Sequence, residues 1–407
     1  MATKKRNYAV DFWRVIATLA VCWGHLNVAY RFKARGMYDG ALFTEGNVLG
    51  VFLIFSGYFM MKSFMSKKEK GLLEGKTPRM AAVDYLKTRY MGLWPALFMG
   101  LLIGFIYNYV GYLTGMWESA VLTTDAMTQQ PLNALQVLQY NLFGTLPSFM
   151  GLASTGFLGN LGIAYAWNVP LWYISTIMVG GYFLYYLLCK DEDLMTGFII
   201  PAILVICPSV WCLSELEMND RLSLFCGLFD NALAFGIWGI SLGIFLYRFY
   251  ERFRKMKIGH TGKVWLTVIN VIMTLVLLWW EVKPGGNYWR GTYELFIDLY
   301  VSVAMAFCVA NQDFFTQKVL DHKIFSTLGE YSLYFFICHM PAISLVSSFW
   351  AVESKNDYYI ALVIVIAISA VAGLICQFIC KKGILPLMHK LDDAIQTCTR
   401  NGMKDTV

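Results

Sequence analysis

The stretch DFWRVIATLAVCWGH, residues 11–25, is an apolar segment with an arginine near its start and a histidine at its end. In a helix, the spacing from Arg14 to His25 turns the chain through about 1100°, so both side chains share a face, ~16 Å apart along the axis. Ionisable groups inside a bilayer are costly, so this pair indicates a function. The alternative is that Arg14 reaches lipid phosphates and His25 bonds a neighbouring backbone carbonyl.

Composition places this stretch in a membrane protein. Of 407 residues, 57% are hydrophobic and only 15% are charged, against roughly a quarter charged in soluble domains. We therefore expect an all-α, polytopic helical bundle. The net charge of +6 lies mainly in loops, so it indicates topology and not nucleic-acid binding. The ten cysteines show no metal-ligand spacing, and the pairing of Cys212 with Cys226 is left open, with the unpaired state favoured.

Ten segments approach the ~20 apolar residues that a helix needs to cross the hydrocarbon core. We expect one membrane domain over residues 1–381 and a short cytoplasmic tail over 382–407. The predicted spans are approximately 8–29, 46–66, 90–113, 166–188, 195–213, 229–248, 264–281, 293–311, 328–350 and 358–380.

The loops predict the orientation. Lys and Arg crowd residues 62–89 and 248–263, whereas residues 114–168 contain neither, so the positive-inside rule places both termini in the cytoplasm. Within the basic-free segment, residues 142–162 (LFGTLPSFMGLASTGFLGNLG) are too rich in glycine for a regular span. We expect a re-entrant or surface-lying element there, covering an outward cavity. One outer basic cluster, Arg31 to Arg35, is explained by a solvated loop more readily than by an anionic acceptor.

Two further segments carry polar candidates near the expected inner half of the membrane. Arg89 lies at the cytoplasmic end of the third segment, and with Arg14 it suits a clamp for a phosphorylated ligand. Ordinary positive-inside anchoring explains Arg89 equally well. Ser56, between Gly50 and Gly57, belongs to a small-residue patch that favours close helix packing.

Polar candidates also occur in the fourth, eighth and ninth segments. An aromatic belt explains Trp172, and a bond to its own helix explains Ser175. Glu294 and Asp298 are four residues apart and share a face; solvation is the favoured explanation, and the alternative is a carboxylate that orients His25 or holds an acceptor's hydroxyls. His339, close to Pro341, is expected near the middle of the membrane. The sequence supports equally well a histidine that lines a cavity and one that is simply buried.

Five motifs together resemble the membrane acyltransferase-3 family, integral membrane enzymes that O-acetylate bacterial surface polysaccharides. They are an R-x10-H pair (Arg14, His25), GVFLIFSGYFM (Phe52, Ser56, Gly57), TRYMGLWP (Arg89, Pro95), PLWYIS (Trp172, Ser175) and LGEYSLYFFICHMP (Gly329, Ser332, His339, Pro341).

The chain also departs from the family pattern. Phe336 replaces a tyrosine, Gly92 stands where many members have a second arginine, and Ile177 and Met178 occupy a stretch that often holds an acidic residue. Part of the donor site is therefore expected to differ, and the donor need not be acetyl-CoA.

The resemblance implies acetyl-CoA or another acyl-CoA as the cytoplasmic donor, with no permanently bound cofactor and no metal. Arg14 and Arg89 would hold the CoA phosphates, and His25 would deprotonate an acceptor hydroxyl or take the acyl group itself. The acceptor would be a cell-envelope or exported polysaccharide at the inner or plasma membrane; a homo-oligomer is left open. Two alternatives remain: a secondary transporter, which the lack of an evident inverted repeat weakens, and a non-catalytic sensor or scaffold.

Overall fold

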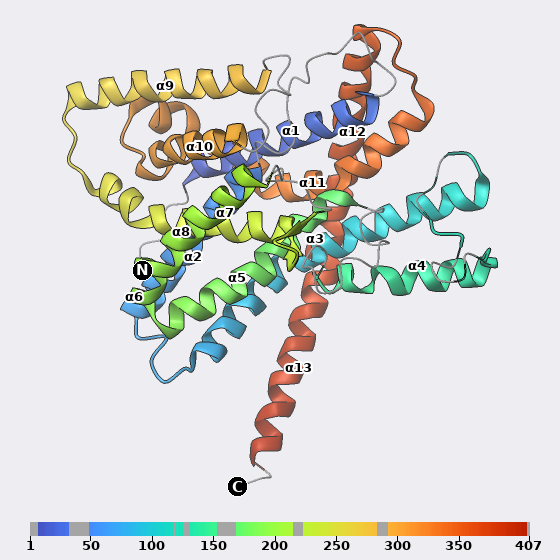
Figure 1. Cartoon of the computed structure of the whole chain (residues 1–407), viewed down its shortest axis with the longest axis horizontal. Helices are drawn as coiled ribbons and strands as arrows, with labels where there is room; N and C mark the ends of the chain where they lie inside the picture. Colours follow the sequence, from blue (N-terminus) through green and yellow to red (C-terminus); the bar gives the residue numbers. More distant parts are fainter. Residues whose placement is uncertain are drawn as a thin grey trace.

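The protein is represented by a computed structural model that describes residues 7–31, 49–117, 119, 121–124, 128, 130–152, 168–214, 223–282 and 292–404. These residues are mostly helical, with one short antiparallel pair, β1 (Leu224–Phe225) and β2 (Phe229–Asp230). The predicted all-α class is confirmed (Figure 1). The helices are α1 (Tyr8–Arg31), α2 (Leu49–Glu69), α3 (Pro78–Thr114), α4 (Ala134–Phe149), α5 (Trp172–Lys190), α6 (Glu192–Leu194), α7 (Ile200–Leu213), α8 (Asn231–Lys255), α9 (His260–Val282), α10 (Thr292–Ala310), α11 (Ile324–Phe349), α12 (Lys355–Ile379) and α13 (Leu385–Lys404).

Each of the ten predicted segments contains a helix. Not every one of these helices is long and apolar enough to count as a membrane span. Over the described residues, seven helices are long and apolar enough to span a bilayer, and α10 supplies a shorter apolar stretch over Leu295–Ala310. The seven come from α3, α5, α6 to α7, α8, α9, α11 and α12 continued into α13. The protein is therefore a multi-pass helical membrane protein, and ten spans with cytoplasmic termini stay a prediction.

Helix α3 begins twelve residues before the predicted third span. Thr77 caps it by accepting from the Met80 amide at 3.2 Å, and Pro78 occupies the first helical turn. Thr at the cap and Pro at the first position are strong start signals because they satisfy or remove amides that have no helical partner. Gly115, with φ of 64°, ends the helix by donating to the Gly111 carbonyl. The polar first turns of α3 thus precede its apolar part.

Helices α2 and α8 cross with their backbones in contact. A Cβ at Gly57 would lie 1.9 Å from the Ile240 carbonyl oxygen, and one at Gly243 would lie 2.0 Å from the Ile54 oxygen. Only glycine permits such an approach, which is how helices pack closely in membranes. The predicted packing role of the small-residue patch is confirmed for Gly57.

The glycine-rich segment after α3 folds back along that helix. Trp94 Nε1 of α3 donates to the Phe149 carbonyl at 2.7 Å, and the rings of Phe98 and Phe149 lie 5.7 Å apart. Helix α4 therefore runs beside α3 from its C-terminal end toward its middle (Figure 1). That this element is re-entrant or lies on the membrane surface stays a prediction. Residues 153–162, the rest of the predicted covering element, lie outside the described residues.

The segment after residue 381 is helical where it is described. A π-helical turn, Cys380–Ile384, joins α12 to α13, which projects away from the bundle (Figure 1). Lys87 Nζ of α3 lies 2.5 Å from Asp392 Oδ1 of α13 and ties the two together. The tail predicted as a short extension is thus a helix with its own contact to α3.

Candidate active site

Two histidines from different helices meet inside the bundle. His25 near the end of α1 is 6% exposed, and His339 of α11 is fully buried. His339 Nε2 lies 3.4 Å from His25 Nδ1, and the ring centroids are 5.1 Å apart. The sequence singled out both residues, and the packing of α1 against α11 brings them together.

The backbone contacts of this pair determine where its protons lie. His25 Nδ1 faces the Val21 carbonyl at 2.9 Å, and His339 Nδ1 faces the Phe336 carbonyl. A carbonyl oxygen can only accept, so both Nδ1 atoms carry a proton, and in neutral imidazole the lone pair then sits on Nε2. The single His25 Nδ1 hydrogen therefore lies between two acceptors, the Val21 carbonyl at 2.9 Å and His339 Nε2 at 3.4 Å, and the basic atom of the pair is His25 Nε2.

Aromatic rings surround the histidine pair. The Phe336 ring lies 5.2 Å from that of His339 and 5.0 Å from that of Tyr173 in α5. Phe52 of α2 lies 5.9 Å from the Tyr173 ring. Ser56 supports this wall because its hydroxyl donates to the Phe52 carbonyl at 2.7 Å. Four helices, α1, α2, α5 and α11, thus contribute to one site.

Arg14 occupies a different environment on the same helix. Its side chain is 36% exposed, and its Nη1 atom lies 3.5 Å from Asp11 Oδ1. Asp11 is buried against Gly329 of α11, where a Cβ would come within 2.5 Å of the Asp11 Cβ. Arg14 is thus oriented by the buried Asp11 carboxylate, and part of its side chain stays exposed. Planar guanidinium donors in this setting suit a phosphate or carboxylate.

Arg89 lies among the aromatic rings of α3 and α5. Its Nε atom donates to the Tyr85 hydroxyl at 3.2 Å, and its guanidinium carbon lies 5.3 Å from the Tyr85 ring centre. Tyr85 stacks on Tyr185 with ring centres 4.5 Å apart. Arg89 is half-buried. A two-arginine clamp with Arg14 stays a prediction, since these contacts hold Arg89 within its own cluster.

The predictions for the fourth segment need correction. Trp172 is 1% exposed and packs 6.4 Å from the Phe235 ring, so an aromatic belt at the lipid surface does not explain it. Ser175 is fully buried, and its hydroxyl makes no hydrogen bond within the described residues. The predicted bond to its own helix is made instead by Thr176, which donates to the Tyr173 carbonyl at 2.9 Å.

The solvated carboxylate expected in the eighth segment is also wrong for Asp298. Asp298 is 2% exposed and packs against α2, where a Cβ at Gly50 would lie 1.8 Å from Asp298 Oδ1. The close approach of α2 and α10 buries it, and a pattern of charges along one helix does not reveal such an approach. The side chain of Glu294 lies outside the described residues.

Cys212 and Cys226 are separate thiols, as favoured from the sequence.

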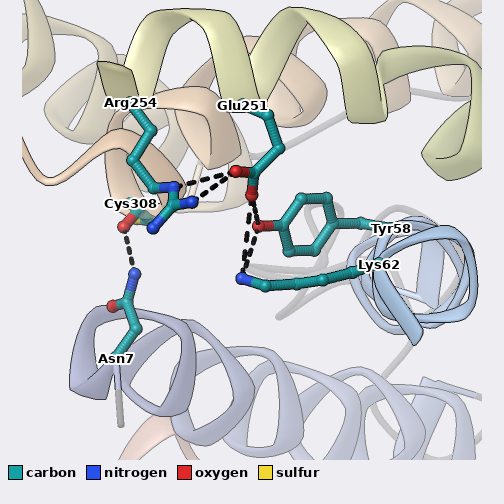
Figure 2. Close-up of polar contacts among 6 residues, drawn as sticks. All are labelled: Asn7, Tyr58, Lys62, Glu251, Arg254 and Cys308. Atoms are coloured by element: carbon teal, nitrogen blue, oxygen red, sulfur yellow. Dashed lines mark hydrogen bonds and ion pairs between the residues drawn. The ribbon is translucent and has the colours of Figure 1, made fainter. Parts of the chain in front are cut away.

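Sequence reasoning missed a charged cluster at the basic ends of α2 and α8, shown in Figure 2. Tyr58 donates to Glu251 Oε1 at 2.7 Å, and Lys62 donates to the Tyr58 hydroxyl at 2.9 Å. Arg254 donates to Glu251 Oε2 through Nε at 3.0 Å and Nη2 at 2.5 Å. The i, i+3 spacing of Glu251 and Arg254 was the one available signal. The cluster extends the contact between α2 and α8 beyond the glycine crossing.

Comparison with known proteins adds the family. Within the described residues no three His, Cys, Asp or Glu side chains gather as a metal site. A search of curated proteins finds no match. The family model described as an acyltransferase domain, that of the acyltransferase-3 family, matches residues 7–380. Because this match covers nearly the whole chain, the protein belongs to the acyltransferase-3 family.

Proposed function

We propose that this membrane acyltransferase moves an acyl group, most simply acetyl, from cytoplasmic acyl-CoA to a hydroxyl of a cell-envelope or exported polysaccharide. The observation that carries the proposal is the buried pair of His25 and His339, with the proton on each Nδ1 fixed by a backbone carbonyl. A general base needs a lone pair and a partner that stabilises the charge it acquires. His25 Nε2 supplies the lone pair, and on the other side of the ring His339 Nε2 and the Val21 carbonyl share the Nδ1 hydrogen.

The reaction then follows from these two atoms. His25 Nε2 takes the proton of the acceptor hydroxyl while the oxygen attacks the thioester carbonyl. The imidazolium that forms donates more strongly from Nδ1 to its two acceptors, the Val21 carbonyl and His339 Nε2, because hydrogen bonds from charged donors are stronger. When the tetrahedral intermediate collapses, the carbon–sulfur bond breaks and His25 returns the proton to the departing thiolate. The products are the O-acyl ester and free CoA.

Arg14 is proposed to bind the donor. Its partly exposed side chain and its buried partner Asp11 suit the phosphates of CoA. Arg89 is proposed as a second phosphate contact, supported by its being only partly buried on α3. Because Gly92 replaces a family arginine, the donor site need not select acetyl-CoA, and longer acyl-CoAs belong in the same assay.

The test is release of free CoA thiol from a panel of acyl-CoAs by purified protein supplied with envelope glycan. We expect turnover in wild-type protein and a loss of about 10²–10⁴-fold in His25→Ala, the usual contribution of a general base. His322→Gln is the matched control, because His322 is exposed and lies after α10. Turnover that is absent with every acyl-CoA, or equal in the wild type and His25→Ala, would overturn the proposal.

The alternative covalent route has its own signature. If His25 takes the acyl group itself, acyl-CoA without acceptor releases a burst of CoA equal to the enzyme concentration, because the acyl-enzyme accumulates. If His25 acts as a general base, no burst occurs without acceptor. A rapid-quench measurement of CoA in the first turnover separates the two.

A further inference from the structure

Helix α11 lacks a backbone hydrogen bond beside the histidine pair. Pro341 lies inside α11, two residues after His339. Proline has no amide hydrogen, so the carbonyl four residues earlier, that of Ile337, loses its helical donor. Ile337 is fully buried, and a buried carbonyl without a partner costs about 1–3 kcal/mol. Something other than α11 must therefore supply this hydrogen bond.

The donor is Asn168, which precedes the short 3-10 turn Val169–Leu171 at the start of α5. Its Nδ2 atom donates to the Ile337 carbonyl at 2.7 Å and to the Gly100 carbonyl of α3 at 3.1 Å. Asn168 is 3% exposed. Both amide hydrogens of one side chain are thus used to join α11 to α3.

Glycine makes this contact possible. A Cβ on Gly100 would lie 3.1 Å from the Ile337 Cβ and 3.3 Å from Asn168 Nδ2, tighter than ordinary contact. The approach of α3 to α11 is therefore close at the point where Asn168 donates. The Asn168 amide therefore supplies the Ile337 carbonyl with the donor that Pro341 lacks.

We propose that Asn168 is a positioning residue for the histidine pair, acting through the Ile337 carbonyl that Pro341 leaves without a donor. The proposal rests on the proposed function of His25 and His339. The path from Asn168 to the histidine pair is short. Asn168 holds the Ile337 carbonyl, and Phe336, whose carbonyl fixes the proton of His339 Nδ1, directly precedes Ile337. If the backbone at Phe336 and Ile337 shifts, the His339 ring turns with it. The 3.4 Å contact from His339 Nε2 to His25 Nδ1 then changes as well.

The test is a double-mutant cycle between Asn168→Leu and Pro341→Ala. Pro341→Ala restores an amide that can donate to Ile337, so it makes the Asn168 donor redundant. We expect Asn168→Leu to lower kcat at least tenfold with KM for acyl-CoA within twofold. In the Pro341→Ala background the same change should lower kcat less than threefold. Equal losses in both backgrounds would overturn the proposal.

The matched control is Asn141→Leu. Asn141 is also fully buried, and its Nδ2 atom donates to the Leu122 and Val137 carbonyls at 2.9 and 2.8 Å, but it lies in α4. A general cost of losing a buried amide should lower thermal stability in both variants. Only Asn168→Leu should couple to Pro341. Equal coupling of Asn141→Leu to Pro341 would count against the proposal.

A second readout does not depend on acyl transfer. The chain has only five histidines, so ¹⁵N-histidine spectra of the protein in lipid can resolve the buried pair, assigned with His25→Gln and His339→Gln. Asn168→Leu should shift the Nδ1 and Nε2 resonances of His339, and Asn141→Leu should not. Unshifted resonances would refute positioning even if the wild type is active. Shifted resonances in a protein without acyl-CoA turnover would refute the proposed function alone.

Discussion

At the scale of single residues, His339 is expected to act only through His25. His339→Phe keeps a ring of similar size and removes both nitrogens, so the His25 imidazolium keeps the Val21 carbonyl but loses its second acceptor, His339 Nε2. We predict a fall in kcat of about 10²-fold, within the range of general acid–base effects. Combined with His25→Ala, the change should cause almost no further loss, because residues that act as one unit are not additive. Steady-state kinetics of the four proteins measure this, and multiplicative losses would show that the two act separately.

Arg14 is expected to affect donor binding more than chemistry. Arg14→Gln removes the fork of donors, and a charged hydrogen bond contributes about 1.5–3 kcal/mol, so KM for acyl-CoA should rise about 10–100-fold with kcat little changed. Arg14→Lys should recover only part of this, because an ammonium cannot form two parallel bonds. Arg252→Gln, an exposed arginine of α8, serves as the control. An unchanged KM in Arg14→Gln would remove Arg14 from the donor site.

The sequence predicted only those site residues whose signal is local. The spacing of Arg14 and His25, and the cost of a mid-membrane His339, could be recognised without any fold. Asp298 was misjudged and Asn168 missed because their burial depends on contacts with Gly50 and Gly100, which are far away in the sequence. Which carbonyl faces each imidazole is likewise decided by helix packing.

At the scale of helices, the α2–α8 crossing is predicted to depend on Gly57. A Cβ there would lie 1.9 Å from the backbone oxygen of Ile240, which cannot rotate away. Gly57→Ala should therefore destabilise the folded protein by about 1–3 kcal/mol, the usual cost of overpacking. Gly92→Ala in α3 is the matched control, since no atom lies within 4 Å of its Cβ position, and alanine favours helix by about 1 kcal/mol.

The measurement is thermal unfolding of both glycine variants in the same detergent or lipid. A lowered midpoint for Gly57→Ala beside an unchanged or raised one for Gly92→Ala is expected. Equal midpoints would mean that α2 and α8 do not meet as described.

The existence of these helices could be predicted from long apolar runs in the sequence. The start of α3 at Pro78 could not, because it is set by a polar cap that hydropathy does not register.

At the scale of the whole molecule, the distribution of charge predicts the orientation. Both termini should face the cytoplasm, because residues 62–89 and 248–263 are basic and residues 114–168 carry no Lys or Arg. A fluorescent protein fused after residue 407 should fold and fluoresce, and a periplasmic phosphatase inserted near residue 128 should be active. The opposite pattern would invert the topology and place Arg14 away from cytoplasmic CoA.

The most direct test of the central claim follows the acyl group itself. Membranes that contain the protein and envelope glycan would be given acyl-CoA labelled in the acyl carbon, and label would be counted in the isolated glycan. We predict base-labile label on the glycan with the wild type and with His322→Gln, and about 10²–10⁴-fold less with equally folded His25→Ala. Equal labelling by His25→Ala would contradict the account, because the transfer would then proceed without the basic atom of the buried histidine pair.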